Sequence, residues 1–545
     1  MEKNKIKNPI IGGFYPDPSI CRVGKDFYII NSSFSTFPGI PIFHSEDLAN
    51  WQQIGYVLNR PSQLKVCTYS ITGGLMAPTI RYHKGIFYVI CTNMDHGGNF
   101  IVTATDPAGP WSEPFWLEDV KGIDASLYFD EDGRAYVTGT GSYEEYPGKN
   151  TRGIWISEID LDKMKLIGGT KFIWNSALRN ASSPEAPHIY KKDGYYYLVI
   201  AEGGTEFYHA VTVARSRELF GWYEGNPANP IMTHRHLGKT YPISNIGHAD
   251  FVELEDGSWY AVMLGSRIFG GHHKNLGRET YLAPVTWEED WPLISPETGK
   301  IEWSYEAPNL PWKPFAKPPT RDDFDQDHLG LQWNFLGNDT DGFWELRDSK
   351  LILRLLPYSV TQELKSIREA NRNWPVPSIS FVGRRQEHIN FKASVKLEFH
   401  SDYENETAGF MLMQACNHHY RMDRISRGGK QLLQLILSTA DISCPQHIPG
   451  FKAKTTQNVL AEVEIQADTI YLMMEEKGQN INFYYGEKEG EWKTLYENAD
   501  VRLINPEIVG GMVGTYLGLY TSSNGMESNN KAEIDWFDYI GYENY

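Results

Sequence analysis

The chain has 545 residues, of which 41% are apolar and 13% are aromatic, and its formal net charge is −18. This length predicts more than one domain, and the apolar and aromatic content excludes a mainly disordered protein. The acidic balance argues against nucleic-acid binding, and no apolar run approaches the roughly 20 residues that a membrane span requires.

The N-terminus and the cysteines favour a cytoplasmic protein. Residues 1–10 carry positive charges but lack the apolar segment of a signal peptide, and whether such a peptide has been removed is left open. The five cysteines form no C-x-x-C pair, which argues against a zinc site or a disulfide framework. They are Cys21, Cys67, Cys91, Cys416 and Cys444. We therefore expect reduced thiols.

A short phrase recurs five times in the first half of the chain: a turn with glycine, then in most copies an aromatic residue, then a tyrosine and apolar residues. Its tyrosines are Tyr28, Tyr88, Tyr136, Tyr197 and Tyr260, at steps of 60, 48, 61 and 63 residues. Each phrase is typical of a β-hairpin, and a unit of about 50–60 residues is typical of a propeller blade. The sequence predicts a five-bladed β-propeller over about residues 8–305, with a β-sandwich as the alternative.

Stepping back 11 or 12 residues from each repeat tyrosine reaches the start of the preceding strand. The innermost strands of a propeller line its axis, so these starts point to one end of it. The residues there are Asp17, Ala77, Asp124, Glu185 and His248. Each alone is compatible with a turn former or an ordinary polar residue. Three carboxylates brought together cost electrostatic energy, so their convergence indicates function.

Facing carboxyl groups are the groups that glycoside hydrolysis requires. One has to remain protonated to donate to the leaving oxygen, and the other has to remain ionised to activate water or attack carbon. Crowding of like charges separates their pKa values, and a third carboxylate can keep the pKa of the acid raised. Aromatic side chains can stack on sugar rings, although most of them are expected in the blade cores.

Six short stretches carry a family resemblance. They are residues 8–19, 33–39, 122–127, 184–188, 247–250 and 276–280. In this order, and at the repeat positions, they resemble glycoside hydrolase family 43, the five-bladed β-xylosidases and α-L-arabinofuranosidases. The resemblance spans about residues 8–315 and continues into the second half of the chain.

The resemblance implies an inverting mechanism with three carboxylates. Asp17 would be the general base that activates water, and Glu185 would be the general acid. Asp124 would raise the pKa of the acid and position it. Arg278 would be the cation beside the carboxylates and the sugar, with a surface salt bridge as its alternative.

The resemblance also implies residues around the sugar. Phe34 would form the hydrophobic wall of the terminal subsite. His248 would lie on the axis, in some relatives beside calcium, so it is the candidate metal ligand. No cofactor is required, and a calcium ion at the propeller centre stays open. Met76 stands where relatives usually carry an aromatic platform, and it would stack less well on a sugar. Ala125 stands where relatives often carry proline, which affects backbone stiffness.

Residues 306–322 are rich in proline and predict a stiff connector. The expected organisation is therefore a catalytic propeller at residues 1–305, a linker at residues 306–322 and a second domain at residues 323–545.

Strand-like segments alternate with short turns in the second domain, a pattern typical of an antiparallel β-sandwich. The clearest are residues 351–355, 393–397, 432–437, 461–465 and 470–474. The domain resembles the concanavalin-like C-terminal domain of the same β-xylosidases. In such relatives a loop leans over the propeller pocket, and residues 510–518 match it. We expect Tyr516 or a neighbour to border the pocket, with a place in the sandwich core as the alternative.

These observations favour an exo-acting, inverting glycosidase that removes terminal β-D-xylose or α-L-arabinofuranose from short xylo- and arabino-oligosaccharides. An endo-arabinanase would need an open groove. A retaining fructan-type enzyme would need carboxylates about 5 Å apart rather than about 6.5–9.5 Å, and the chain lacks the Arg-Asp-Pro phrase of those enzymes. A non-catalytic sugar-binding propeller would not need three axial carboxylates. The sequence leaves the sugar preference, the metal requirement and the oligomeric state open, and relatives suggest a homo-oligomer, either a dimer or a tetramer.

Overall fold

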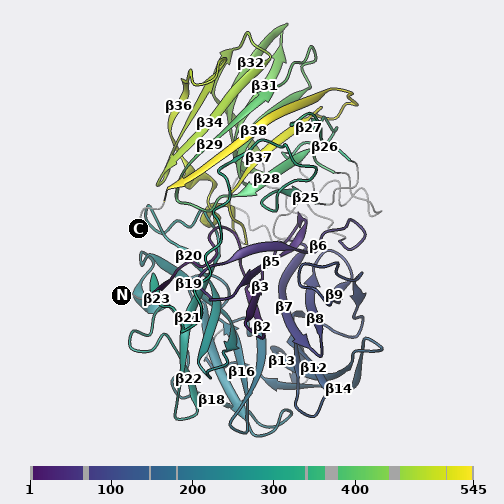
Figure 1. The fold of residues 1–545 in the computed structure, drawn as a ribbon, viewed down its shortest axis with the longest axis vertical. Coiled ribbons are helices and arrows are strands. Elements are labelled where there is room, and N and C mark those ends of the chain that lie inside the picture. Colours follow the sequence, from purple (N-terminus) through teal and green to yellow (C-terminus); the bar gives the residue numbers. More distant parts are fainter. Residues whose placement is uncertain are drawn as a thin grey trace.

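The computed structural model describes residues 4–64, 73–146, 149–178, 182–337, 342–361, 378–440, 455–510 and 512–542. In this part of the chain almost all regular structure is β-strand, in five four-stranded sheets, two eight-stranded sheets and one two-stranded pair. The four-stranded sheets gather into one body and the eight-stranded sheets into another (Figure 1). The prediction of an all-β chain with a five-bladed propeller followed by a β-sandwich is confirmed.

Each blade is an antiparallel sheet whose strands follow one another in the chain. Blade 1 has β2 (Ser19–Val23), β3 (Asp26–Ile30), β5 (Gly39–Ser45) and β6 (Gln52–Leu58); blade 2 has β7 (Leu75–His83), β8 (Ile86–Asn93), β9 (Gly98–Ala104) and β10 (Phe115–Trp116); blade 3 has β11 (Ile123–Phe129), β12 (Ala135–Tyr146), β13 (Lys149–Asp160) and β14 (Lys165–Trp174). Blade 4 has β15 (Glu185–Lys192), β16 (Tyr195–Glu202), β17 (Ala210–Ser216) and β18 (Glu224–Gly225), and blade 5 has β19 (Ile243–Glu253), β20 (Trp259–Arg267), β21 (Glu279–Glu288) and β22 (Trp291–Ile294).

The first strands of the blades form the inner ring of the propeller. β2, β7, β11, β15 and β19 pack in this order, and β19 returns to β2. The N-terminal segment helps to close the ring, because β1 (Lys5–Lys7) pairs with β23 (Ser304–Glu306). Asn8 adds hydrogen bonds from its side-chain amide to the carbonyl oxygens of Leu282 and Glu302, each 2.9 Å long.

A buried carboxylate ties the inner ring together. Asp250 is completely buried and accepts hydrogen bonds from Arg81 at 2.8 and 3.0 Å, from the Tyr190 hydroxyl at 2.6 Å and from the Ser19 hydroxyl at 2.6 Å. The four residues belong to blades 5, 2, 4 and 1. Burial acts to raise the pKa of Asp250, but Arg81 and the other partners outweigh it and hold that pKa well below its ordinary value. The charge is therefore fully paired, as a buried charge has to be.

The sandwich consists of two antiparallel sheets that pack face to face. One contains β24 (Arg321–Asp322), β26 (Trp344–Leu346), β27 (Leu351–Arg354), β29 (Asn390–Glu398), β34 (Thr469–Lys477), β35 (Asn480–Gly486), β36 (Lys493–Asp500) and β38 (Lys531–Tyr542). The other contains β4 (Thr36–Phe37), β25 (Asn334–Leu336), β28 (Phe381–Arg385), β30 (Thr407–Ala415), β31 (His418–Arg427), β32 (Lys430–Ala440), β33 (Thr455–Glu464) and β37 (Tyr516–Ser522).

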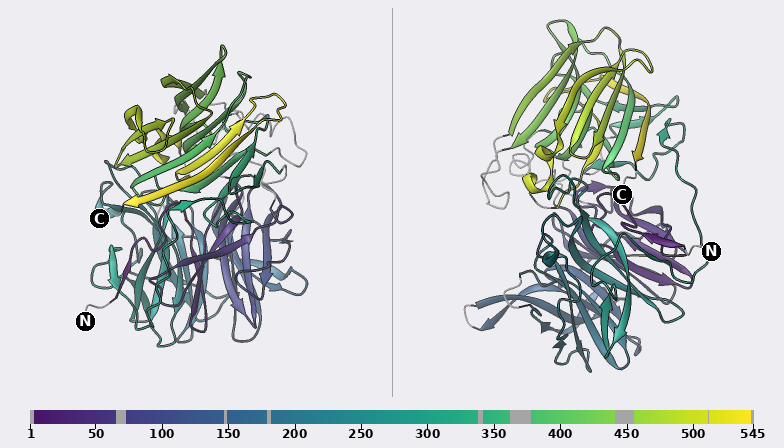
Figure 2. Two further views of the ribbon diagram at one scale, coloured as in Figure 1. Left: turned by 45° about the horizontal axis from the view of Figure 1, so that its top comes forward. Right: turned by 90° about the vertical axis from the view of Figure 1, so that its left-hand side faces the viewer.

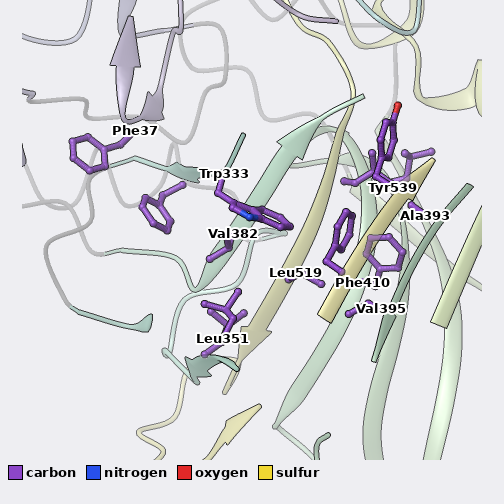
Figure 3. Close-up of a cluster of buried hydrophobic side chains, with 14 of the residues drawn as sticks. Phe37, Trp333, Leu351, Val382, Ala393, Val395, Phe410, Leu519 and Tyr539 are labelled. Carbon is purple, nitrogen blue, oxygen red and sulfur yellow. The ribbon is translucent and has the colours of Figure 1, made fainter. Parts of the chain in front are cut away.

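The two bodies share a hydrophobic core. The sandwich stacks on one end of the propeller in both views of Figure 2. Strand β4 lies in the first blade segment but pairs with β25, so Phe37 becomes part of a sandwich sheet. Its ring stacks on Phe335 at 6.3 Å, and the same buried cluster continues through Trp333 and Phe410 (Figure 3).

Helical structure is scarce in the described residues. It comprises η1 (Arg235–Leu237), η2 (Val501–Ile504) and α2 (Pro506–Val509). None of the helices in this part of the chain has the length and hydropathy of a membrane span. Cys21, Cys91 and Cys416 are free thiols, whereas Cys67 and Cys444 lie outside the described residues.

The replacement Asp250→Ala tests the role of this buried carboxylate in holding the inner ring together. It leaves the Arg81 guanidinium buried without its counter-ion, so we expect a loss of about 3–5 kcal/mol of stability. Calorimetry should show a clearly lower unfolding temperature. Asp132→Ala is the matched control, since it removes the carboxylate of an exposed ion pair with Arg134. An equal effect of the two substitutions would contradict the importance of the axial pair.

Candidate active site

A β-bulge at the start of the innermost strands forms the scaffold of the site. In blades 2 to 5 the pairing of the first two strands skips two residues. The first skipped residue has a left-handed backbone, with φ of 44° at Ala77, 55° at Asp124, 50° at Ala186 and 55° at His248. Asp17 adopts the same conformation at φ 52°, just before β2. Left-handed backbone is costly for residues other than glycine, and its repetition at one end of the axis marks a functional surface.

The backbone corrects the predicted register in blade 4. Ala186, and not Glu185, is the counterpart of Asp17 and Asp124, and Glu185 lies one position earlier, at the place that Met76 occupies in blade 2. The reason is the length of the hairpin turn. Blades 1, 2 and 4 have two-residue turns between their first strands, which put the bulge residue 11 positions before the tyrosine; the longer turns of blades 3 and 5 make it 12.

Asp17 is held as an anion. Its Oδ1 accepts a 2.7 Å hydrogen bond from Nη1 of Arg278, and its Oδ2 accepts one of 2.7 Å from the Ser32 hydroxyl. Nδ1 of His248 lies 3.8 Å from Oδ1. Burial raises the pKa of the Asp17 carboxyl. Arg278, His248 and Ser32 together lower it by more than burial raises it, so this pKa lies below its ordinary value.

Asp124 and Glu185 are shifted in the opposite direction. Burial raises the pKa of Asp124 well above its ordinary value, and the charges of Glu185 and Asp17 raise it more. Burial also raises the pKa of Glu185, with Arg152 acting against it and Asp17 acting with it. The mutual influence of the three carboxylates places them in one site, as the repeat pattern predicted. The site therefore combines one carboxyl group whose pKa is lowered with two whose pKa values are raised.

Arg278 links Asp17 to Thr205 in blade 4. The same Nη1 atom that binds Asp17 also donates to the Thr205 hydroxyl at 2.9 Å. Its Nη2 atom is buried and has no hydrogen-bond partner among the described residues. The guanidinium lies 5.8 Å from the ring centre of Phe34. A surface salt bridge, the alternative for Arg278, is thereby excluded.

Aromatic and sulfur-containing side chains form an apolar wall next to these charges. Phe34 is buried and stacks on Phe14 at 5.5 Å with a 12° angle between the rings. Met76, which is half-buried, packs against the same cluster. Phe34 is fixed by two backbone hydrogen bonds with Leu75, each 3.0 Å long. The two predicted apolar residues, Phe34 and Met76, thus belong to one cluster, and Phe34 lies beside Arg278.

The sandwich supports this wall. Tyr516 is only 5% exposed and belongs to the cluster of Phe14 and Phe34. Arg385 from β28 reaches into the propeller, donates from Nε to the carbonyl oxygen of Phe14 at 2.8 Å and lies over the ring of Tyr15 at 4.4 Å. Tyr516 therefore contacts the site wall from within the interface of the two bodies.

His248, the candidate metal ligand, lies beside Asp17. Burial lowers the pKa of its imidazole, which favours the neutral form. Within the described ranges, no group of three or more His, Cys, Asp or Glu side chains is arranged to hold a metal ion. Further along the inner strands, the guanidinium of Arg81 is bound to Asp250 at 2.8 Å and to Nδ1 of His188 at 3.0 Å.

Sequence reasoning missed four residues that shape the site. They are Ser32, Arg152, Thr205 and Arg385. Thr205 follows two glycines with positive φ at the end of β16, and this tight turn was a signal that could have drawn attention to it. Arg152 and Arg385 stand in ordinary strand sequence, and no local pattern distinguishes them.

Comparison with known proteins assigns the family. Residues 6–292 match the model of glycosyl hydrolases family 43. The chain belongs to this family. Residues 321–540 match the family's beta xylosidase C-terminal concanavalin A-like domain, so the sandwich is of the predicted type.

Several similar proteins match this chain over nearly its whole length. A xylosidase/arabinosidase of Butyrivibrio fibrisolvens is 44% identical over 97% of this chain and 98% of its own. A non-reducing end alpha-L-arabinofuranosidase of Bacteroides ovatus is 37% identical over 99% of this chain and 95% of its own. The crystal structure of a xylan beta-1,4-xylosidase from Bacillus halodurans has a TM-score of 0.87 at 33% identity, and the match covers 98% and 99% of the two chains. This chain is thus a glycoside hydrolase.

The raised pKa of Asp124 predicts a stability cost at neutral pH. The folded state binds a proton on Asp124 more tightly than the unfolded state, so this contribution is fully favourable below the ordinary pKa of 3.8 and is lost as the pH rises toward the folded pKa. We expect Asp124→Asn to raise the unfolding temperature by about 2–4 °C at pH 8 and hardly at all near pH 4.

The exposed residue Asp162, in the turn after β13 of the same blade, provides the control. Asp162→Asn should leave the unfolding temperature nearly unchanged at both pH values. A gain for Asp124→Asn that is equal at pH 4 and pH 8 would show that packing, and not charge, is responsible.

Proposed function

We propose that this enzyme removes single β-D-xylose or α-L-arabinofuranose units from the non-reducing ends of short oligosaccharides, with inversion at the anomeric carbon. Asp17 is the general base, Glu185 is the general acid, and Asp124 keeps the acid protonated and in place. The observation that carries this proposal is the opposite shift of the pKa values within one buried group of three carboxylates.

The charges divide the acid and base roles among these carboxylates. Arg278 and Ser32 stabilise the ionised form of Asp17, which is the form that can accept a proton from water. Each of its oxygens still has a lone pair for a water molecule. Glu185 has a raised pKa and is less buried than Asp17, as a group that has to reach the leaving sugar requires.

The reaction then needs one concerted displacement. Asp17 takes a proton from water while the water oxygen attacks the anomeric carbon. The bond to the leaving oxygen breaks, its electron pair stays on that oxygen, and Glu185 supplies the proton. The unpaired Nη2 of Arg278 supports a role in holding a sugar hydroxyl, and Phe34 provides an apolar face beside it.

Exo action is supported by the way in which the sandwich covers the propeller. Gly277, next to Arg278, has the carbonyl oxygen of Val513 only 2.4 Å from the position of an added Cβ. A Cβ added at Gly514 would likewise lie only 2.5 Å from the Cβ of Phe14. These contacts cover one side of the site, which favours a pocket for a chain end over the open groove of an endo-arabinanase.

The names of the relatives support both sugars. The similar proteins include a xylosidase/arabinosidase, an arabinofuranosidase and a xylosidase, and the expected platform position holds Met76, which imposes little shape on a sugar ring. Catalysis needs no cofactor. A calcium ion at the centre, Tyr516 as part of the pocket lining, a homo-oligomeric state and a cytoplasmic location remain proposals. Calcium titration, Tyr516→Phe kinetics, sedimentation and cell fractionation respectively test them.

The test is an assay of wild type and Asp17→Asn on nitrophenyl β-D-xyloside and α-L-arabinofuranoside, with product anomers followed by NMR. We expect wild type to release at least one sugar with inverted configuration. Loss of the general base should lower kcat by about 10²–10⁴-fold.

Asp193→Asn is the matched control, because Asp193 is an exposed carboxylate in a turn of blade 4. It should keep the wild-type rate. Release of neither sugar would favour a binding propeller, release of internal fragments from arabinan would favour the endo-arabinanase, and a retained anomer would overturn the inverting mechanism.

A further inference from the structure

Arg152 faces Glu185 from the open side of the site. It lies on β13 of blade 3, opposite Ser142 on β12. Its Nη1 atom is 3.3 Å from Oε1 of Glu185, and its side chain is 45% exposed. Arg278 is buried and bound to Asp17. The two guanidinium groups therefore approach the carboxylates from the solvent side and from the buried side.

A guanidinium beside a general acid has two opposing effects. It stabilises the ionised carboxylate, so at high pH a smaller share of the enzyme carries the proton that catalysis needs. It also stabilises the carboxylate that remains after proton transfer, so it makes the protonated group a stronger acid. The first effect matters only on the alkaline side of the pH profile, whereas the second acts at every pH.

We propose that Arg152 is the counter-ion that receives the Glu185 carboxylate formed when the glycosidic bond breaks. This role rests on the function proposed above. The electron pair of the breaking bond goes to the leaving oxygen, which takes the proton of Glu185. The resulting negative charge lies 3.3 Å from Arg152. The proton of the attacking water goes to Asp17, and exchange with solvent restores both groups.

The surroundings of Glu185 leave this role to Arg152. The other groups that face it are Asp17 from the loop before β2, Asp124 from β11, Arg278 from the loop before β21 and the Ser183 hydroxyl from its own segment. Burial has the largest influence on the pKa of Glu185 and raises it. Arg152 has the next largest influence and lowers that pKa. Arg278 lowers this pKa less, and its guanidinium is bound to Asp17 at 2.7 Å.

The experiment compares Arg152→Gln with wild type on two substrates. A nitrophenyl glycoside has a leaving group that needs little protonation, whereas the corresponding disaccharide depends on the acid. We expect kcat on the disaccharide to fall about threefold to tenfold, with the nitrophenyl rate within about twofold of wild type. The alkaline limb of kcat/KM should move up by about 0.5–1 pH unit.

Two further variants separate charge from structure. Arg134→Gln removes another exposed arginine, which lies just before β12 at the other end of the same strand pair and pairs with Asp132 and Glu158. It should change neither kcat on the two substrates nor the position of the alkaline limb of kcat/KM. Arg152→Lys retains the charge and should keep the limb close to that of wild type. An unmoved limb in Arg152→Gln, or equal losses on both substrates, would overturn the proposal.

An infrared measurement keeps the outcome independent of the assay. The protonated carboxyl band of Glu185, obtained as the difference from Glu185→Gln, is followed against pH. Its midpoint should be higher in Arg152→Gln than in wild type. If no sugar is released but the midpoint moves, the proposed function fails while the pairing of Arg152 with Glu185 stands. If the midpoint does not move, the counter-ion role fails.

Discussion

The geometry of the site depends on the contacts of the buried Asp250 carboxylate with residues of three other blades. Ser19, His188 and Asp250 each lie two positions after a residue with left-handed backbone, in three different blades. Asp250 binds the Ser19 hydroxyl directly and lies 3.8 Å from His188, and Arg81 from a fourth blade binds Asp250 at two points. The layer next to the three clustered carboxylates is thus fixed by the buried ion pair of Asp250 with Arg81. A shift of any bulge would break a hydrogen bond that water cannot replace.

The site above this layer is electrostatically costly, and its arginines determine how the cost is distributed. Three carboxylates share a buried space, and a buried cation neutralises only one of them, Asp17. Asp124 has no cation within ion-pair distance among the described residues, so protonation is the remaining way to lower its energy. Arg152, which approaches from the solvent side, partly offsets the rise in the pKa of Glu185. Catalytic competence and local instability therefore have one physical origin.

The sequence predicted the parts of this arrangement that depend on local chemistry. Glycine turns and alternating strands are local, so the five repeats identified the five blades, and their register led to Asp17 and Asp124. The register failed by one residue at Glu185, because the spacing depends on turn length, and only the pairing of β15 with β16 reveals the bulge. Glu185 was still named, because the side chain before the bulge residue also reaches the site.

Long-range contacts explain what the sequence could not predict. Arg385 and Phe14 are 371 residues apart, yet one hydrogen bond joins them. Arg385 is almost completely buried, and its guanidinium packs between Tyr15 and Tyr516. It thereby fixes the segment that runs from Phe14 to Asp17, and through the stacking of Phe14 it also fixes Phe34. No pattern within the strand around Arg385 contains this information. The sandwich is consequently a structural part of the candidate site, because the wall beside Asp17 is held from the second domain.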